Sequence, residues 1–147
     1  SNQRIIALDI GSKTVGIAKT DPMATIVEPH KVLRHESFQD VKAFDQLIQE
    51  LQELEPKTII LGIPLNHDES EGPQAKKVRD FVNRFKKYLK AKQISPEDFE
   101  WVYWDEYYTT KEAEEFLIAQ DVSRAKRKKI IDKMAAYYIL SRYLEER

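Results

Sequence analysis

Acidic residues lie within or next to apolar segments at three places in the sequence. Asp9 interrupts an apolar strand near its carboxyl end, Asp105 and Glu106 end the last predicted strand, and Asp132 lies in the first turn of the final predicted helix. A buried charge is unfavourable unless it is paired or binds a cation. Carboxylates that meet at one edge of a sheet repel one another, and a hard divalent cation removes that repulsion.

Carboxylates and water are the ligands that Mg²⁺ and Mn²⁺ prefer. Two such ions, about 3.5 to 4 Å apart, can activate a water molecule and stabilise the leaving oxygen of a phosphodiester. Each carboxylate also has a simpler interpretation. Asp9 and Asp105 could each cap a turn, and Asp132 could complement a helix dipole. For Asp9, the first hairpin alone supports both interpretations equally.

A hairpin is predicted to carry Asp9. Residues 5–10 and 15–19 are apolar strands joined by a turn that contains Gly11, and residues 26–33 supply a third strand. Glycine lets another backbone approach closely, so we interpret Gly11 and Gly16 as clearance for a nucleic-acid backbone.

The middle of the chain alternates between helix and strand. Ser37 is predicted to cap a helix that Pro56 stops, and the wholly apolar residues 58–63 form a buried strand. A second helix begins near Pro73, since proline favours the first helical turn, and residues 75–89 carry its apolar stripe.

The last third of the chain is predicted to hold one strand and two helices. Residues 99–104 form the strand, Thr109 and Glu112 form a capping box for a short helix, and residues 130–144 form the final helix. Three strands followed by alternating helices and strands predict an α/β fold: a mixed five-stranded sheet with helices on both faces.

Composition limits the class of protein. The 147 residues are 41% hydrophobic and contain no cysteine, which excludes disulfides and thiolate chemistry and suits a reducing cytoplasm. Neither a spanning apolar segment nor a signal-peptide pattern is present, so we expect a soluble protein without a membrane partner. Residues 3–147 are expected to form one domain, with Ser1 and Asn2 resembling a tag scar.

Charge is balanced overall, at a formal −1, but is segregated along the chain. From Gln74 to Lys92 there are eight basic residues against one acid, and from Glu36 to Glu55 six acids against one lysine. A further basic run, residues 124–129, lies just upstream of Asp132. Solvated helix faces can look the same, so these patches are a modest indication of a polyanionic partner.

Four motifs, in order along the chain, resemble the YqgF family, also called RuvX, within the RNase H-like superfamily. Residues 8–11 with 15–18 match its first-strand motif, and residues 62–66 with 71–75 and 78–79 match its middle motif. The last two are Asp105-Glu106 with Thr109-Thr110 and Ala113, and Asp132 with Ala135-Ala136. Four motifs at family-like spacing are a far stronger signal than a single Asp-x-Gly.

The resemblance implies an RNase H-like fold and a metal-dependent nuclease, an endo- or exonuclease of structured nucleic acid. Its leading assignment is maturation of the 5′ end of 16S ribosomal RNA in ribosome biogenesis, with Holliday junction resolution in DNA recombination or repair as the older proposal. By analogy, Asp9, Glu106 and Asp132 are the catalytic residues and the ligands of Mg²⁺ or Mn²⁺, with two ions expected and Asp105 as a further candidate ligand. The implied partners are an rRNA precursor or branched DNA and the ribosome.

The sequence also departs from the family pattern. The family usually has Asp-Glu-Arg-Leu-Thr-Thr where this chain has Asp105-Glu-Tyr-Tyr-Thr-Thr110, which removes an arginine that could contact phosphate. A usual glycine of the middle loop is also replaced, within residues 66–69. These changes leave the carboxylates intact and alter the substrate contacts.

The remaining candidates are residues that could contact nucleic acid, namely Lys13, Asn66, Lys76, Arg79, Arg124, Lys126, Arg127, Lys128 and Lys129. Lys13 could equally be an exposed turn residue, and Asn66 could only form a turn. His67 could serve as an acid or base but is better explained as a solvated loop residue. Tyr107 and Tyr108 could stack on bases, although packing is the commoner role.

Two other functions fit parts of the sequence. An ATP-binding module of the actin and sugar-kinase type also has Asp-x-Gly in its first hairpin, but it requires a second lobe that 147 residues do not supply. A non-catalytic RNA-binding assembly factor could keep the fold. Three retained carboxylates argue against that alternative, because a binding module gains nothing from their repulsion.

Overall fold

A five-stranded mixed sheet organises the computed structural model, which describes residues 2–66, 68 and 70–147. Its strands are β1 (Ile5–Ile10), β2 (Thr14–Thr20), β3 (Val27–Arg34), β4 (Thr58–Ile63) and β5 (Glu100–Asp105), in the order β3-β2-β1-β4-β5. The first three form an antiparallel meander, and β4 and β5 continue parallel to β1. This is the predicted sheet, and each strand end lies within one residue of its predicted position.

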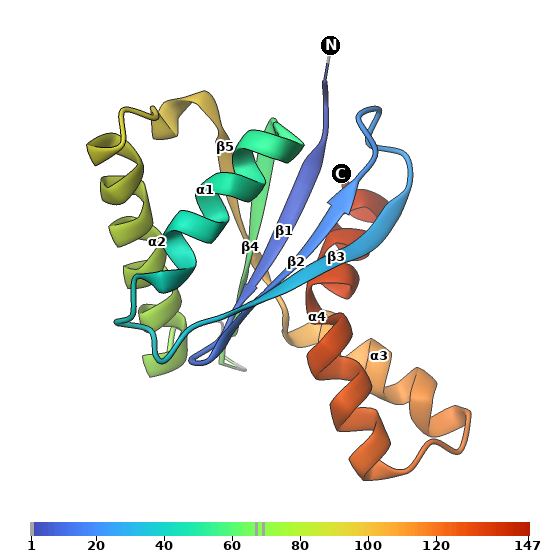
Figure 1. Cartoon of the computed structure of the whole chain (residues 1–147). Coiled ribbons are helices and arrows are strands. Elements are labelled where there is room, and N and C mark those ends of the chain that lie inside the picture. Colours follow the sequence, from blue (N-terminus) through green and yellow to red (C-terminus); the bar gives the residue numbers. More distant parts are fainter. Residues whose placement is uncertain (1, 67, 69) are drawn as a thin grey trace.

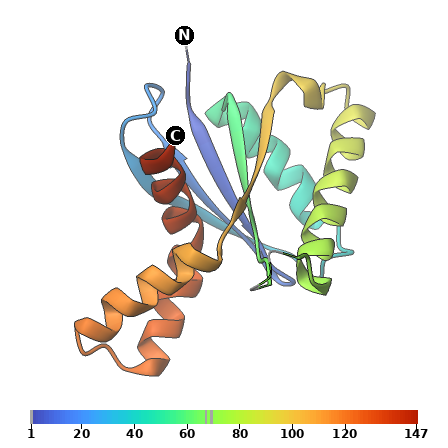
Figure 2. The ribbon, with the colours of Figure 1, turned by 180° about the vertical axis from the view of Figure 1, so that it is seen from behind.

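Helices cover both faces of the sheet, as predicted (Figures 1 and 2). α1 (Lys42–Leu54) and α2 (Pro73–Ala91) lie on one face, and α4 (Arg124–Glu146) crosses the other. A short 3₁₀ turn, η1 (Pro96–Asp98), precedes β5. α3 (Tyr107–Ala119) packs on α4, and this helical hairpin projects beyond the sheet.

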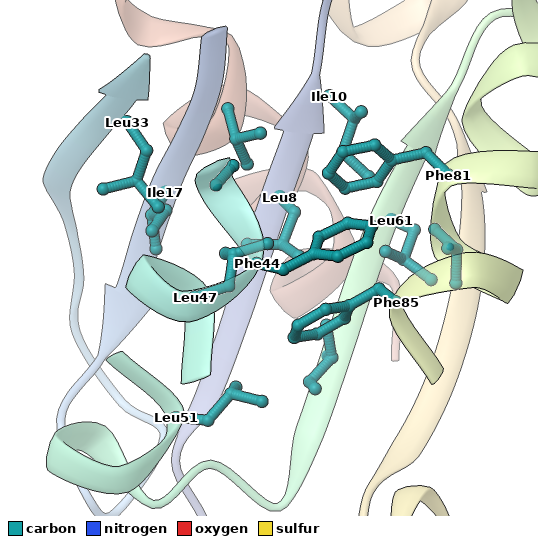
Figure 3. Packing of buried hydrophobic residues seen from close by; sticks show 14 of the residues in the cluster. Leu8, Ile10, Ile17, Leu33, Phe44, Leu47, Leu51, Leu61, Phe81 and Phe85 are labelled. Atoms are coloured by element: carbon teal, nitrogen blue, oxygen red, sulfur yellow. The ribbon is translucent and has the colours of Figure 1, made fainter. Parts of the chain in front are cut away.

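The larger core lies between the sheet and the pair α1 and α2. Alternate strand residues such as Leu8, Ile17 and Leu61 meet Phe44 of α1 and Phe81 of α2 (Figure 3). Because strand side chains alternate between faces, the intervening residues must face α4. These intervening residues include Asp9.

The face beneath α4 is built from smaller side chains. Ala7, Ala18 and Ile60 of the sheet meet Ala136 and Ile139 of the helix. Small residues let the helix backbone approach the strands closely, so α4 can bring its own polar side chains to the sheet surface.

The start of α1 differs from the prediction. The helix begins at Lys42, five residues after Ser37, and the Ser37 hydroxyl accepts only from the backbone N–H of Gln39, at 3.2 Å. The carboxylate of Asp40 accepts instead from the N–H groups of Lys42, at 2.9 Å, and Glu36, at 2.7 Å. Ser37 as the helix cap was wrong, because Asp40 lies nearer to the first turn.

Unlike α1, the last two helices begin earlier than predicted. α3 begins at Tyr107, which places Thr109 inside the helix, so Thr109 is not its cap. α4 begins at Arg124, where the Ser123 hydroxyl accepts from the N–H of Lys126 at 3.3 Å. Asp132 therefore lies in the third turn of α4, and its placement in the first turn was wrong. At that depth the helix dipole no longer explains it.

One acidic residue of α1 is buried rather than solvated. Glu50 is 3% exposed, and its carboxylate accepts from the His30 ring at 2.7 Å and the Lys31 ammonium at 2.5 Å, both on β3. A register shift near Ile17 lets these two consecutive residues of β3 reach the same carboxylate.

None of the helices in the described part of the chain combines the length and the apolar character that a membrane span requires.

Candidate active site

Asp9 occupies the α4 face of the sheet, next to the end of β1. It pairs across the ladder with Gly16 of β2, and a Cβ added to Gly16 would lie 3.7 Å from the Asp9 Cβ and 3.8 Å from the Ala136 Cβ. Gly16 therefore lies beside α4, which disfavours its interpretation as clearance for nucleic acid. A Cβ there would make only ordinary contacts, so the approach of α4 does not require glycine at this position.

Glu106 reaches Asp9 across an intervening strand. β4 lies between β1 and β5, so the two backbones are about 10 Å apart. The strand between them presents Gly62 at this point, and a Cβ there would lie 2.8 Å from Glu106 Oε2 and 2.5 Å from Ile139 Cδ1. Without a side chain, Gly62 leaves the space that the Glu106 carboxylate occupies.

The pKa shifts of Asp9 and Glu106 indicate that the two groups share a proton. Glu106 precedes α3 as its N-cap residue but makes no capping hydrogen bond, so its carboxyl group is available to Asp9. Burial, followed by the charge of Asp9 and the hydrogen bond between the two, raises the pKa of Glu106 to about 8. Burial also raises the pKa of Asp9, which the hydrogen bond from Glu106 opposes. At neutral pH the protonated Glu106 donates to the Asp9 carboxylate.

Asp132 lies close enough for its charge to raise the pKa of Asp9 further. Its side chain is 65% exposed, and it accepts from the Lys128 ammonium one helical turn away, at 3.3 Å. Within residues 2–66, 68 and 70–147, no three acidic or histidine side chains are already arranged to hold one metal ion. Asp132 would have to turn from Lys128 toward the carboxyl pair to complete such a set.

Asp105 lies on the opposite face of the sheet from this pair. Side chains of alternate residues in β5 share a face of the sheet with Asp105. Of these, Trp101 and Tyr103 pack on the core beneath α1 and α2, whereas the intervening Val102 and Trp104 pack on the α4 side. The charge of Asp105 contributes only the smallest of the effects that raise the pKa of Glu106. This placement disfavours Asp105 as a ligand beside Asp9.

The predicted basic run forms the first turns of α4. Lys126, Lys128 and Lys129 are exposed there, whereas the Arg127 side chain is only 17% exposed. Arg124 is also exposed. This run is thus placed on the same helix as Asp132 and within one to two turns of it.

The other predicted nucleic-acid contacts are more scattered. Arg79 is paired with Glu71 at 2.6 Å and lies 4.2 Å from the centroid of the Tyr103 ring, while Lys76 is exposed on the same helix. Lys13 donates to the backbone carbonyl of Glu36 at 2.7 Å. The structure does not bring these three to the carboxyl pair.

Asn66 is tied into its own loop. Its amide donates to the Ser70 hydroxyl at 3.1 Å, and its backbone N–H donates to the Ser70 carbonyl at 2.9 Å. The turn role therefore accounts for its contacts. His67 lies outside the described residues, as do the side chains of Tyr107 and Tyr108, so these three expectations stay predictions.

Two residues that support the site were missed from the sequence. Gly62 was noted as part of a motif, but only the fold reveals that it admits Glu106. His35 is 5% exposed, and its ring contacts the Gly11 carbonyl at 2.8 Å, beside the end of β1. A glycine within an otherwise apolar strand was the one available signal for Gly62. For His35 the sequence offered none.

Two neighbouring hollows border Glu106 and Asp132. One, of about 380 Å³, is lined by Glu106, Pro64, Leu65 and Thr110 among others. A second, of about 330 Å³, includes Asp132 in its wall. Substrate can thus approach the carboxyl groups from outside the sheet.

Comparison with known proteins shows which family the chain resembles. The sequence model of a family described as "RuvX: Holliday junction resolvase" matches residues 3–146. Relatives named "Putative pre-16S rRNA nuclease" include one from Caldanaerobacter subterraneus, 38% identical, covering 97% of this chain and 96% of the relative. Another, from Thermoanaerobacter pseudethanolicus, is 40% identical with the same coverage of each.

Solved structures share the fold at low sequence identity. The Thermus thermophilus RuvC in complex with Holliday junction substrate superposes with a TM-score of 0.56 at 11% identity, covering 97% of this chain and 93% of that one. The fowlpox virus Holliday junction resolvase gives 0.52 at 15% identity, covering 99% and 100%. The predicted RNase H-like fold is thereby confirmed.

Proposed function

Because the chain belongs to the RuvX family, we propose that it is a metal-dependent nuclease of structured nucleic acid whose main substrate is the precursor of 16S ribosomal RNA. The names of its relatives support the RNA substrate, and the fold of the resolvases supports hydrolysis of phosphodiester bonds. The observation that carries the proposal is the proton-sharing pair Asp9 and Glu106, with Asp132 beside it.

That pair argues against the simpler interpretations. The Asp9 side chain faces Glu106 rather than a turn, and Glu106 makes no capping bond. Two partly buried carboxyl groups that can ionise together only with difficulty reduce the stability of the protein, so a function must retain them. A binding module has no need of them.

The donor set fits a hard divalent cation. Asp9, Glu106 and Asp132 supply only carboxylate oxygens, and the shared proton marks a site where a positive charge is favoured. When bound there, Mg²⁺ or Mn²⁺ acts as a Lewis acid on a phosphate oxygen and lowers the pKa of a water ligand. That two ions bind stays a prediction.

Binding of a cation would change the protonation and the partners of the residues around it. Glu106 would lose its proton to solvent on becoming a ligand, so that it and the already ionised Asp9 could both hold the cation. As a ligand, Asp132 would turn away from Lys128, and that ammonium would then be free to contact a phosphate of the substrate. Gly62 keeps the space that holds Glu106 close to Asp9.

The test is cleavage of a 16S rRNA precursor with and without Mg²⁺. We expect Asp9→Asn to lower the rate of metal-dependent cleavage by about a hundredfold or more, because it removes one charged ligand. Asp98→Asn is the matched control, since Asp98 is exposed in η1 at the other end of β5. Equal cleavage by Asp9→Asn and the native chain would refute the catalytic assignment.

The description of the family favours a second substrate, the four-way DNA junction. The same variants are assayed on such a junction, and cleavage of DNA but not of the rRNA precursor would reverse the order of the two substrates. If neither is cut by the native chain, a non-catalytic assembly role is the remaining alternative. Association with the ribosome and the expected cytoplasmic location stay predictions.

A further inference from the structure

A basic hollow of about 330 Å³ lies between α3 and the first turns of α4. We define this basic hollow by the residues that line it, namely Thr110, Glu114, Arg124, Arg127, Lys128, Ile131 and Asp132. Residues 124, 127, 128 and 131 recur at helical spacing, so one flank of α4 provides most of the wall. The formal charge of this wall is positive, since three cations face two carboxylates.

The basic hollow adjoins the candidate active site. Asp132 is part of its wall, and it shares Thr110 and Glu114 with the neighbouring hollow that contains Glu106. A strand of nucleic acid with one phosphate at the carboxylates would therefore place a nearby phosphate at this hollow.

Arg127 has an unused hydrogen-bond donor there. One terminal nitrogen, Nη1, donates to the Val122 carbonyl at 2.9 Å and fixes the guanidinium. Its Nε is buried and makes no hydrogen bond, an arrangement that it shares only with Arg4 Nε among the described residues. The nearest carboxylate oxygen, on Glu114, is 4.0 Å away. A buried donor without an acceptor is costly. Because Nε is covered in this conformation, the Arg127 side chain must shift toward the hollow for an incoming oxygen to satisfy it.

We propose that the basic hollow binds a phosphate group of the substrate strand next to the phosphate that is cut, with Arg127 as its main donor. A guanidinium held in one orientation suits the tetrahedral oxygens of phosphate. Arg124 and Lys128 add positive charge, and the Thr110 hydroxyl can donate. Glu114 opposes the anion and keeps Arg127 partly compensated while the hollow is free.

The identity of the strand rests on the proposed function, but the binding of phosphate does not. The experiment therefore measures binding and not cleavage. Fluorescent RNA hairpins with a single-stranded 5′ tail are titrated in the presence of a chelator, over a range of salt concentrations. Loss of metal-dependent cleavage would refute the nuclease without affecting this measurement.

The variants are Arg127→Met, Arg127→Lys and Glu114→Gln, with Lys133→Met as the matched control. Lys133 is exposed, follows Asp132 in α4 and lines a different hollow, so its loss changes net charge equally without touching the basic hollow. We expect Arg127→Met to weaken binding about tenfold more than Lys133→Met and to lower the salt slope by about one. Arg127→Lys should be intermediate, and Glu114→Gln should bind more tightly than the native chain.

Equal losses in Arg127→Met and Lys133→Met, in variants whose circular dichroism matches the native chain, would overturn the proposal. Backbone amide shifts on adding inorganic phosphate give a second check, since shifts must gather at residues 110, 114 and 123–128. Tails with 5′-phosphate and 5′-hydroxyl ends identify the source. A preference for the 5′-phosphate that Arg127→Met removes assigns a terminal phosphate, whereas equal losses for both tails assign an internal one.

Discussion

At the scale of single residues, the site depends on a missing side chain as much as on the acidic ones. Glu106 meets Asp9 only because Gly62 places no side chain on the strand between them. The acidic residues could be predicted from the sequence, because a charge within or after an apolar strand conflicts with burial. The role of Gly62 could not, because it depends on which strands are neighbours and on which face Glu106 lies.

Gly62→Ala should therefore separate the two carboxyl groups. Its Cβ would lie within 2.8 Å of Glu106 Oε2 and 2.5 Å of Ile139 Cδ1, so both must move. We expect a loss of about 1 to 3 kcal/mol in the free energy of unfolding and a fall in metal-dependent cleavage. Denaturant unfolding and the cleavage assay measure the two effects.

Gly16→Ala is the matched control for that substitution. Its Cβ would make ordinary contacts, at 3.7 Å with Asp9 and 3.8 Å with Ala136, although it lies on the same face of the sheet. It should keep most stability and activity. If the two alanine variants behaved alike, the space over Gly62 would not be what positions Glu106.

At the scale of elements, the strands and their order in the chain could be predicted, whereas the helix starts could not. Strands 58–63 and 99–104 are dense in apolar residues; the sheet buries the first, and the second lies half-buried at its edge. For α4, apolar periodicity begins at Ile130, where the helix reaches the rest of the fold. Its first six residues contact little of the sheet, so their pattern carried no signal, and the helix start at Ser123 and Arg124 was missed.

Ser123 should be needed for the ordered start of α4. Its hydroxyl satisfies the Lys126 N–H, so Ser123→Ala should cost about 1 kcal/mol of local stability. Hydrogen exchange of the amides of residues 124–128 should quicken accordingly, and binding of nucleic acid through the basic hollow should weaken with it.

Ser37→Ala tests the same point from the opposite side. Ser37 was predicted to cap α1, but that helix begins at Lys42 with Asp40 accepting from its first N–H. Its removal should leave the exchange of the α1 amides almost unchanged. A loss at α1 as large as that at α4 would mean that the assigned helix starts are wrong.

At the scale of the whole molecule, the shared proton links folding to pH and to metal. The pKa of Glu106 rises from an ordinary 4.5 to about 8 in the fold, so between these values the folded chain holds more protons than the unfolded chain. The contribution of Glu106 to the free energy of unfolding of the metal-free protein therefore falls as pH rises through this window. Below about pH 4.5 the penalty is absent, and above about pH 8 it levels off.

Glu106→Gln should remove this penalty, because the amide stays neutral and can still donate to Asp9. The difference in the free energy of unfolding between the variant and the native chain should then grow in favour of the variant from pH 5 to pH 8. Taking the difference cancels the titration of the histidines and the other carboxylates. With Mg²⁺ the order reverses, since a cation replaces the proton and stabilises the native chain more at pH 8 than at pH 6. Parallel stability curves for the two proteins without metal would show that Asp9 and Glu106 do not share a proton, and would remove the main support for a cation site there.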